Sequence, residues 1–178
     1  MIFFKTWQRI FQGKKTHTRR PKKNVDEAIR DENGRIIAIK RNKRFWLRLG
    51  DGSVEWPNKQ LQKSVKRGNI NHRADQPSYA IQATRTGAEI GRFRILEIRE
   101  ELIQDISDED IIAEGVEHED VEHLEQPLLN RFLRSRFIAL WDSMYWKSKF
   151  KWENNPEVWV IVFEPLQYTI KPGYNPPT

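Results

Sequence analysis

The chain has 178 residues, no cysteine and a formal net charge of +6. This length suits one domain with a single hydrophobic core. The missing cysteines exclude disulfides, thiolate metal ligands and cysteine nucleophiles, and they fit a reducing cytoplasm. No run of apolar residues is long enough to cross a bilayer, so we expect no membrane association.

The charge is divided unevenly along the chain. Residues 1–99 hold 24 basic and 9 acidic side chains, whereas residues 100–126 hold 12 acidic side chains and no Lys or Arg. A polyanion would be attracted to the first part and repelled by the second. Seven Trp residues accompany the cations. Because cations bind phosphates and aromatic rings stack on bases, the pattern favours a nucleic acid as partner.

Short elements are predicted at the start of the chain. Apolar side chains at helical spacing predict a helix over residues 3–12, ended by Gly13. A strand over Thr16–Arg20 follows. Residues 21–34 are polar and predict a loop or mobile arm, with a two-residue turn at Asn33-Gly34. Further strands are expected at 36–39, 45–49 and 53–56.

The middle of the chain contains the clearest local signal. A short helix is predicted over residues 59–66, and strands over 79–84 and 92–100. Ser107 can then cap a helix whose first turn carries three acidic residues, and Gly115 is placed to end that helix.

The last third predicts a long helix and a buried strand. The helix covers residues 127–145, and Pro165 should end a strand over 158–163, whose unbroken apolar run implies burial on both faces. Residues 171–178 predict a flexible tail. Several short strands with two or three helices indicate the α+β class. The apolar stripe of the long helix consists of Leu129, Phe132, Leu133, Phe137, Leu140, Trp141 and Met144.

Three segments carry a resemblance to a known family. They are residues 13–20, a Gly-Lys-Lys-Thr turn followed by His-Thr-Arg-Arg; residues 104–116, around Ile-Ser-Asp-Glu-Asp-Ile-Ile; and residues 137–164, with Ala-Leu-Trp-Asp-Ser and Asn-Pro-Glu-Val-Trp-Val. In this order they resemble ASCH-domain proteins, especially the longer members found in bacteriophages and prophages. The resemblance implies one α+β domain over residues 1–170, a PUA-like mixed β-barrel with flanking helices and a basic insertion around 21–91.

The same resemblance implies a ligand and a site. Many ASCH proteins are thought to bind RNA, so RNA or DNA is the expected partner, in the cytoplasm of a bacterial or phage-infected host cell. A short bacterial branch removes the acetyl group from acetylated cytidine with a Lys, a Thr and a Glu. The matching positions here are Lys15, Thr18 and Glu114, and we expect neither a cofactor nor a metal.

These three side chains suit amide cleavage on chemical grounds. A Thr hydroxyl needs a neighbouring base, and a Lys can be that base where burial and nearby cations lower its pKa. A Glu can hold or protonate the leaving amine. Alternatively, Glu114 pairs with Lys15 and binds the edge of a cytosine-like base. Replacing Glu114 by Gln should abolish any hydrolysis with the fold intact, because Glu114 lies at the end of a helix.

Other side chains are predicted to bind nucleic acid or to form the core. Trp7, Trp141 and Trp159 lie on apolar faces and belong in the core. His118 and His123 do not share a helical face, so we expect no metal between them. The cations and rings predicted to contact phosphates and bases are Lys14, Arg19, Arg20, Arg44, Trp46, Arg73, Trp146 and Lys149.

Three functions therefore stay open at this point. The first is nucleic-acid binding, RNA above all, by a cleft built from Lys15, Thr18, Arg19, Arg20 and Glu114. The second is an amidohydrolase that acts on an acylated cytidine or another modified nucleoside. The third is a protein-interaction module, in which the basic half and the acidic stretch dock a protein partner.

Overall fold

The computed structural model describes residues 6–54, 77–82 and 89–168. The helix predicted over 59–66, the tail and Arg73 lie outside these residues. Among the helices that are described, none is long and apolar enough to cross a membrane.

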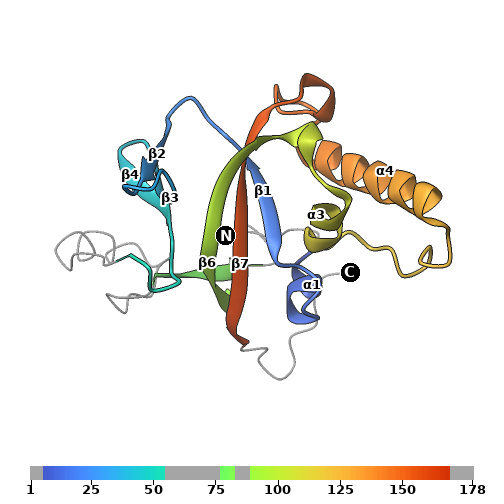
Figure 1. Ribbon diagram of the computed structural model, residues 1–178, viewed down its shortest axis with the longest axis horizontal. Helices are drawn as coiled ribbons and strands as arrows, with labels where there is room; N and C mark the ends of the chain where they lie inside the picture. The colour runs from blue at the N-terminus through green and yellow to red at the C-terminus, as the bar shows by residue number, and fades with distance from the viewer. Residues whose placement is uncertain (1–5, 55–76, 83–88, 169–178) are drawn as a thin grey trace.

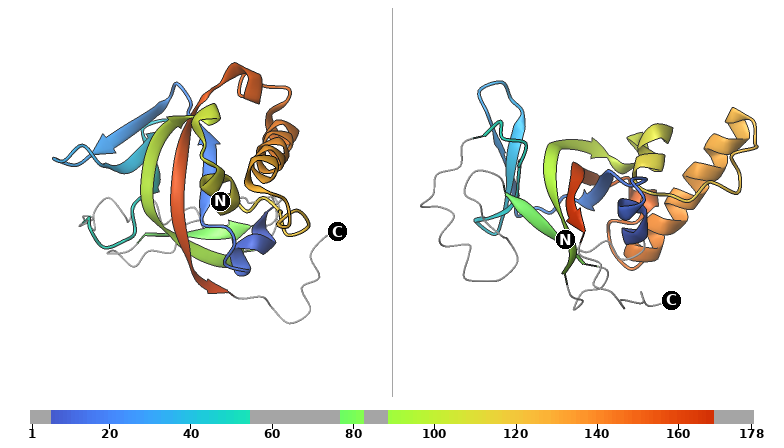
Figure 2. Two further views of the ribbon diagram at one scale, coloured as in Figure 1. Left: turned by 45° about the vertical axis from the view of Figure 1, so that its right-hand side comes forward. Right: turned by 90° about the horizontal axis from the view of Figure 1, so that it is seen from below.

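The larger sheet has the strand order β1-β7-β6-β5, with every pair antiparallel, and it curls into a half-barrel (Figure 1). The predicted α+β class is confirmed, with α3 and α4 on the outer side of the curled sheet (Figure 2). The strands are β1 (His17–Pro21), β5 (Ser78–Gln82), β6 (Glu89–Leu102) and β7 (Glu157–Tyr168).

The expected end of β7 at Pro165 is wrong. The strand continues to Tyr168, and Pro165 lies opposite Phe93, where the register with β6 shifts. Proline has no N–H to donate, so within a sheet it is tolerated at such an irregularity. The unbroken apolar run of β7 thus forms the long central ladder of the half-barrel.

A second sheet of three strands, β2-β3-β4, projects from the opposite side of the molecule to the helices (Figures 1 and 2). It consists of β2 (Asp26–Arg30), β3 (Ile36–Arg41) and β4 (Arg44–Arg48). The loop or arm predicted over 21–34 is therefore wrong. Its polar residues form an edge strand with only partly buried side chains, which leaves little apolar alternation to detect.

The turns of this sheet also differ from the prediction. At the first turn, the N–H of Gly34 donates to the carbonyl of Asp31 at 3.0 Å, and Gly34 has φ 83°. The two-residue turn lies instead at Asn42 and Lys43, with φ 52° and 61°. Positive φ at both central residues defines a type I′ turn, which Asn-Gly usually forms. The strand predicted at 53–56 is not formed at 53–54, which are bends.

Three α-helices are described: α1 (Trp7–Phe11), α3 (Asp108–Ala113) and α4 (Gln126–Tyr145). The predicted cap of α3 is confirmed, because Oγ of Ser107 accepts the N–H of Asp110 at 3.1 Å. Gly115 has φ 81° just after α3, a left-handed conformation that glycine adopts without strain. Single-turn 3-10 helices occur at Ile103–Asp105 and Trp152–Asn154.

Two hydrophobic clusters lie on the two faces of β7. Trp159 and Ile161 belong to the cluster inside the half-barrel, and Val158 and Val160 to the cluster beneath α3 and α4. Burial of β7 on both faces is thereby confirmed, as is the burial of Trp7, Trp141 and Trp159. The apolar stripe of α4 is narrower than predicted: Leu133, Phe137 and Trp141 are buried, but Phe132 and Met144 are exposed.

Candidate functional site

A buried ion pair joins the two ends of the predicted site. Lys15 lies between α1 and β1, and Glu114 directly follows α3. Nζ of Lys15 lies 2.9 Å from Oε2 of Glu114, and it also donates to the backbone carbonyl of Glu114. Lys15 is 3% exposed and Glu114 is 6% exposed. The contact expected between these residues is thus present, in an environment that excludes most water.

The backbone brings this pair together. The N–H of Thr16 donates to the carbonyl of Ala113 at 2.9 Å, which joins the start of β1 to the end of α3. Gly115 then passes so close that a Cβ there would lie 3.0 Å from Cβ of Lys15 and 3.1 Å from Cβ of Arg9. Glycine at this position therefore permits the close approach as well as the turn.

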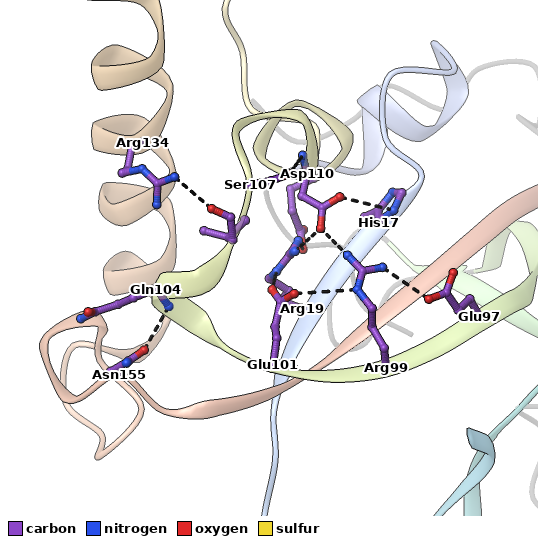
Figure 3. A network of polar contacts seen from close by, with 12 residues as sticks. His17, Arg19, Glu97, Arg99, Glu101, Gln104, Ser107, Asp110, Arg134 and Asn155 are labelled. Carbon is purple, nitrogen blue, oxygen red and sulfur yellow. Dashed lines mark hydrogen bonds and ion pairs between the residues drawn. The ribbon is translucent and has the colours of Figure 1, made fainter. Parts of the chain in front are cut away.

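Arg19 lies at the centre of a network of carboxylates (Figure 3). Its guanidinium donates to Glu114 Oε1 at 3.2 Å, and it also donates to Glu101 and Asp110. Only 3% of Arg19 is exposed. A guanidinium can satisfy several carboxylates because its five N–H groups are fixed in one plane.

The network extends along the outer face of β6. Arg99 donates to Asp110, and its Nε lies 3.8 Å from Glu101 Oε2. On the other side of Asp110, Nε2 of His17 lies 3.8 Å from Oδ1 (Figure 3). Nδ1 of His17 is 2.9 Å from Oγ1 of Thr16. Asp110 is thus shared by three basic side chains from β1 and β6.

Burial and neighbouring charges change the pKa of several of these groups. Burial lowers the pKa of Lys15; the carboxylate of Glu114 opposes this effect, and the positive charges of Arg20 and Arg19 add to it. Burial likewise lowers the pKa of His17. Burial alone would raise the pKa of Asp110, but hydrogen bonding and charge from Arg19, and charge from Arg99, hold it below its usual value.

Thr18 does not share the face of Arg19. In β1, Thr18 lies opposite Ile161 and Arg19 opposite Val160. Directly opposed residues of an antiparallel pair share a face, and successive residues alternate. Thr18 and Arg20 are therefore on the side of the cluster inside the half-barrel. The structure brings Lys15, Arg19 and Glu114 together and directs Thr18 to the other face of the strand.

The acidic stretch neutralises several cations of the basic half and two arginines of α4. Besides Glu114 and Asp110, Glu119 accepts from Lys14 and lies 2.6 Å from a guanidinium nitrogen of Arg9. These two hydrogen bonds hold the pKa of Glu119 far below its usual value. Two further pairs are Arg134 with Asp108 at 3.1 Å and Arg136 with Asp120 at 2.7 Å.

The remaining residues predicted to bind nucleic acid belong to other elements than this network. Arg44 is exposed on β4, and Trp46 of the same strand carries the guanidinium of Arg41 3.5 Å above its ring. Trp146 and Lys149 are exposed just after α4. Because β4 and α4 lie on opposite sides of the molecule (Figure 1), one short ligand does not contact both groups.

Sequence reasoning missed several members of the site. Asp110 was interpreted only as part of a helix cap, Arg99 only as a strand residue, and Glu101 only as one acid of the acidic stretch. Their alternation with apolar neighbours on β6 places them on one face, but the partner across that face comes from α3 and β1. That placement depends on tertiary structure. The one available signal in the sequence was the contrast between the acidic stretch and the basic first half, because clustered carboxylates require cations nearby.

Two hollows lie close to these residues. One, of about 530 Å³, lies between α1 and α4 and is lined by Arg9, Gly115, Glu119 and Arg136, among others. The other, of about 740 Å³, lies between the β2–β3 turn and β6, with Arg30, Arg35 and Arg99 in its wall. In the part of the chain that the structure describes, no group of three His, Asp or Glu is placed to hold a metal ion.

The sequence matches no family model and no curated protein sequence. Solved structures that are similar include a protein from Enterococcus faecalis V583 assigned to the family DUF984, with 10% identity and a TM-score of 0.46, over 95% of this chain and 74% of that one. They also include an ASCH domain from Lactobacillus crispatus JV V101, with 9% identity and a TM-score of 0.36, over 90% of this chain and 69% of that one.

Proposed function

We propose that this protein binds nucleic acid, RNA above all, and that the β2–β4 sheet supplies the main contact. The observation that carries the proposal is a pair of exposed cations beside aromatic rings. Lys43 and Arg44 form no ion pair with any residue that the structure describes, and Phe45 and Trp46 follow Arg44 on β4. The ammonium of the half-buried Lys40 lies 5.4 Å from the centre of the Phe45 ring. Cations and aromatic rings on a strand surface suit phosphate contacts with base stacking.

This location differs from the cleft expected at β1. There, Lys15 and Arg19 are buried and bound by carboxylates, so a phosphate would have to displace internal partners. At the β3–β4 turn, Lys43 and Arg44 are exposed and are available without any rearrangement. The resemblance to ASCH proteins, many of which are thought to bind RNA, supports the same function.

The hollow beside the β2–β3 turn supports a path for the strand. Three arginines line its wall. Arg99 is held by Glu97, Glu101 and Asp110. The side chains of Arg30 and Arg35 are exposed, and each has one carboxylate partner, Glu100 at 3.0 Å and Asp51 at 2.6 Å, besides neutral acceptors. Exposed ion pairs contribute little free energy, so a phosphate can compete for Arg30 and Arg35. We propose that the bound strand runs from the β3–β4 turn toward this groove.

The proposal is tested by binding of a labelled single-stranded RNA, read by fluorescence anisotropy across a range of salt concentrations. The double variant Lys43→Gln with Arg44→Gln should bind more weakly, and its slope of log K against log salt should fall by roughly 1.4, at about 0.7 per lost phosphate contact. Lys14→Gln is the matched control, because its ammonium is held by Glu119. Unchanged binding by the double variant would overturn the proposal.

An amidohydrolase is the second candidate, supported by one observation. Lys15 is buried, its pKa is lowered and it contacts Glu114, which are the properties of a lysine that acts as a base. The test is turnover of acetylated cytidine, followed by chromatography, with Lys15→Ala and Thr18→Ala as variants. Turnover that both variants lose supports the candidate, and absence of turnover in the wild type removes it.

A further inference from the structure

The outer face of α4 carries a regular row of residues. At 3.6 residues per turn, the buried Leu133, Phe137 and Trp141 define the inner face. The row on the directly opposite face, here called the α4 outer row, recurs at intervals of three and four positions. It consists of Leu128, Phe132, Ser135, Ala139, Ser143 and Trp146, all of them exposed.

The α4 outer row is bulky at its ends and small in its middle. Leu128 is 54% exposed, Phe132 46% and Trp146 64%. Large apolar side chains that are exposed together in one row usually mark an interaction site. Ser135 and Ala139 lie between them. Small residues at the centre allow a second helix to approach closely, and large residues at the ends can then fill the space beside it. The row therefore has the shape of a helix-packing surface.

On each flank of the row, a charge near one end of α4 is matched by the opposite charge near the other end. On one flank, Arg131 lies near the start of α4 and Asp142 near its end; on the other flank, Glu125 precedes the helix and Lys147 follows it. In an antiparallel pair of identical helices, equivalent flanks face each other. Reversal therefore brings Arg131 of one copy to Asp142 of the other, and Glu125 to Lys147.

We infer that α4 pairs antiparallel with α4 of a second copy of this chain, about a two-fold axis between Ser135 and Ala139. In this register Leu128 meets Trp146 of the second copy, and Ser135 meets Ala139. The same register joins both charge pairs, each of them twice. A two-fold interface requires a surface that complements itself, and this agreement of shape and charge in one register is what identifies the occupant as a second copy.

This pairing places Trp146 in a protein–protein contact, whereas the sequence predicted that it stacks on a nucleic-acid base. Nζ of Lys147 lies 4.5 Å from the centre of the Trp146 ring, so ring and cation present one combined surface at the end of the row. The β2–β4 sheet is on the other side of the molecule (Figure 2). A dimer through α4 would hold two such sheets at its far ends, and it does not depend on the proposed function.

The oligomeric state of the full chain tests the inference. Sedimentation velocity from micromolar to hundreds of micromolar protein should show a concentration-dependent dimer. Ala139→Arg places a long cation at the centre of the interface and should give a monomer at all these concentrations, while circular dichroism shows an unchanged fold. Leu166→Arg is the matched control, because Leu166 is exposed on β7, away from α4, and it should leave the dimer intact.

A charge exchange tests the antiparallel arrangement itself. Glu125→Lys alone and Lys147→Glu alone should each weaken the dimer at least several-fold, and the two together should restore it. Exchange without restoration would overturn the register, and a wild-type monomer throughout the concentration range would overturn the dimer. If Trp146→Ala weakened binding of labelled RNA and left sedimentation unchanged, the residue would belong to a nucleic-acid contact and the inference would fail.

Discussion

Nζ of Lys15 donates both to the carboxylate and to the backbone carbonyl of Glu114, so one ammonium fixes the end of α3 against the start of β1. Glu114 in turn accepts from Arg19 at 3.2 Å. A carboxylate that is 6% exposed thus compensates two buried cations. Stability and any chemistry at this site depend on the same group.

Glu114→Gln should destabilise the protein by about 3 kcal/mol, because removal of one partner from a buried pair leaves an uncompensated charge. Urea denaturation at neutral pH measures the loss. Glu32→Gln removes the same charge from an exposed position in the β2–β3 turn and should change the free energy of unfolding by less than about 0.5 kcal/mol. The sequence alone predicted that Glu114→Gln leaves the fold intact, whereas the buried ion pair predicts a destabilised fold. Equal stability of the two variants would support the first prediction.

Gly115→Ala should cost more than Gly52→Ala. Both glycines have φ 81°, so both substitutions impose the same left-handed strain, on the order of 1–2 kcal/mol. Only at Gly115 would the new Cβ also meet Lys15 and Arg9 at 3.0 Å and 3.1 Å, whereas Gly52 has nothing within 4 Å. The difference between the melting temperatures of the two variants measures the cost of the contact between the new Cβ and Lys15 and Arg9. Equal melting temperatures would show that the loop around Gly115 can move away from these residues.

Lys43→Gly should stabilise the fold and weaken RNA binding together. Lys43 has φ 61° in the turn between β3 and β4, a conformation that costs a non-glycine residue about 1 kcal/mol. Lys43→Ala loses the same cation but keeps the strain. Thermal unfolding should therefore separate the two variants, whereas anisotropy with labelled RNA should give similar weakening for both. A lower melting temperature for the glycine variant would contradict this account.

Stability should fall as the pH drops below about 6.5, the ordinary pKa of histidine. The pKa of His17 is lowered in the folded protein, chiefly by burial, so the unfolded chain binds the proton first. The neutral form thus contributes its full stability above the ordinary pKa, and this contribution is lost as the pH falls toward the lowered one. Urea titrations at several pH values should show a shallower fall for His17→Gln than for His123→Gln, a substitution at an exposed position; identical profiles would exclude His17 as the cause.

Much of the fold was predictable from local patterns. The apolar run around Trp159 and the cap at Ser107 each depend on neighbouring residues alone, and both are confirmed. Asp26–Arg30 was missed because every side chain of this edge strand is exposed or only partly buried, so neither face requires a row of apolar residues. The turn at Asn42 and Lys43 was missed because it lacks glycine, whereas Asn33-Gly34 has the usual sequence but another geometry.

The candidate site was predictable only in part. Lys15 and Glu114 were named from a resemblance, and their contact is present. The position of Thr18 on the opposite face of β1 follows from the alternation of strand residues once the first strand residue, His17, is known. The role of Arg19 as the shared partner of three carboxylates requires three elements far apart in sequence, β1, β6 and α3, to meet. No spacing along the chain encodes that meeting.

Cations paired with carboxylates and cations without such partners lie on different sides of the molecule, so its charge is distributed unevenly. At the side of α3 and α4, carboxylates of the acidic stretch compensate arginines and lysines. On the β2–β4 sheet, Lys43 and Arg44 are exposed and form no ion pair with a described residue. Among the described residues, these unpaired positive charges therefore lie on the side of the molecule opposite α4 (Figure 1). The electrostatic field would orient the protein relative to an approaching polyanion before contact, so that the β2–β4 sheet makes the first contact.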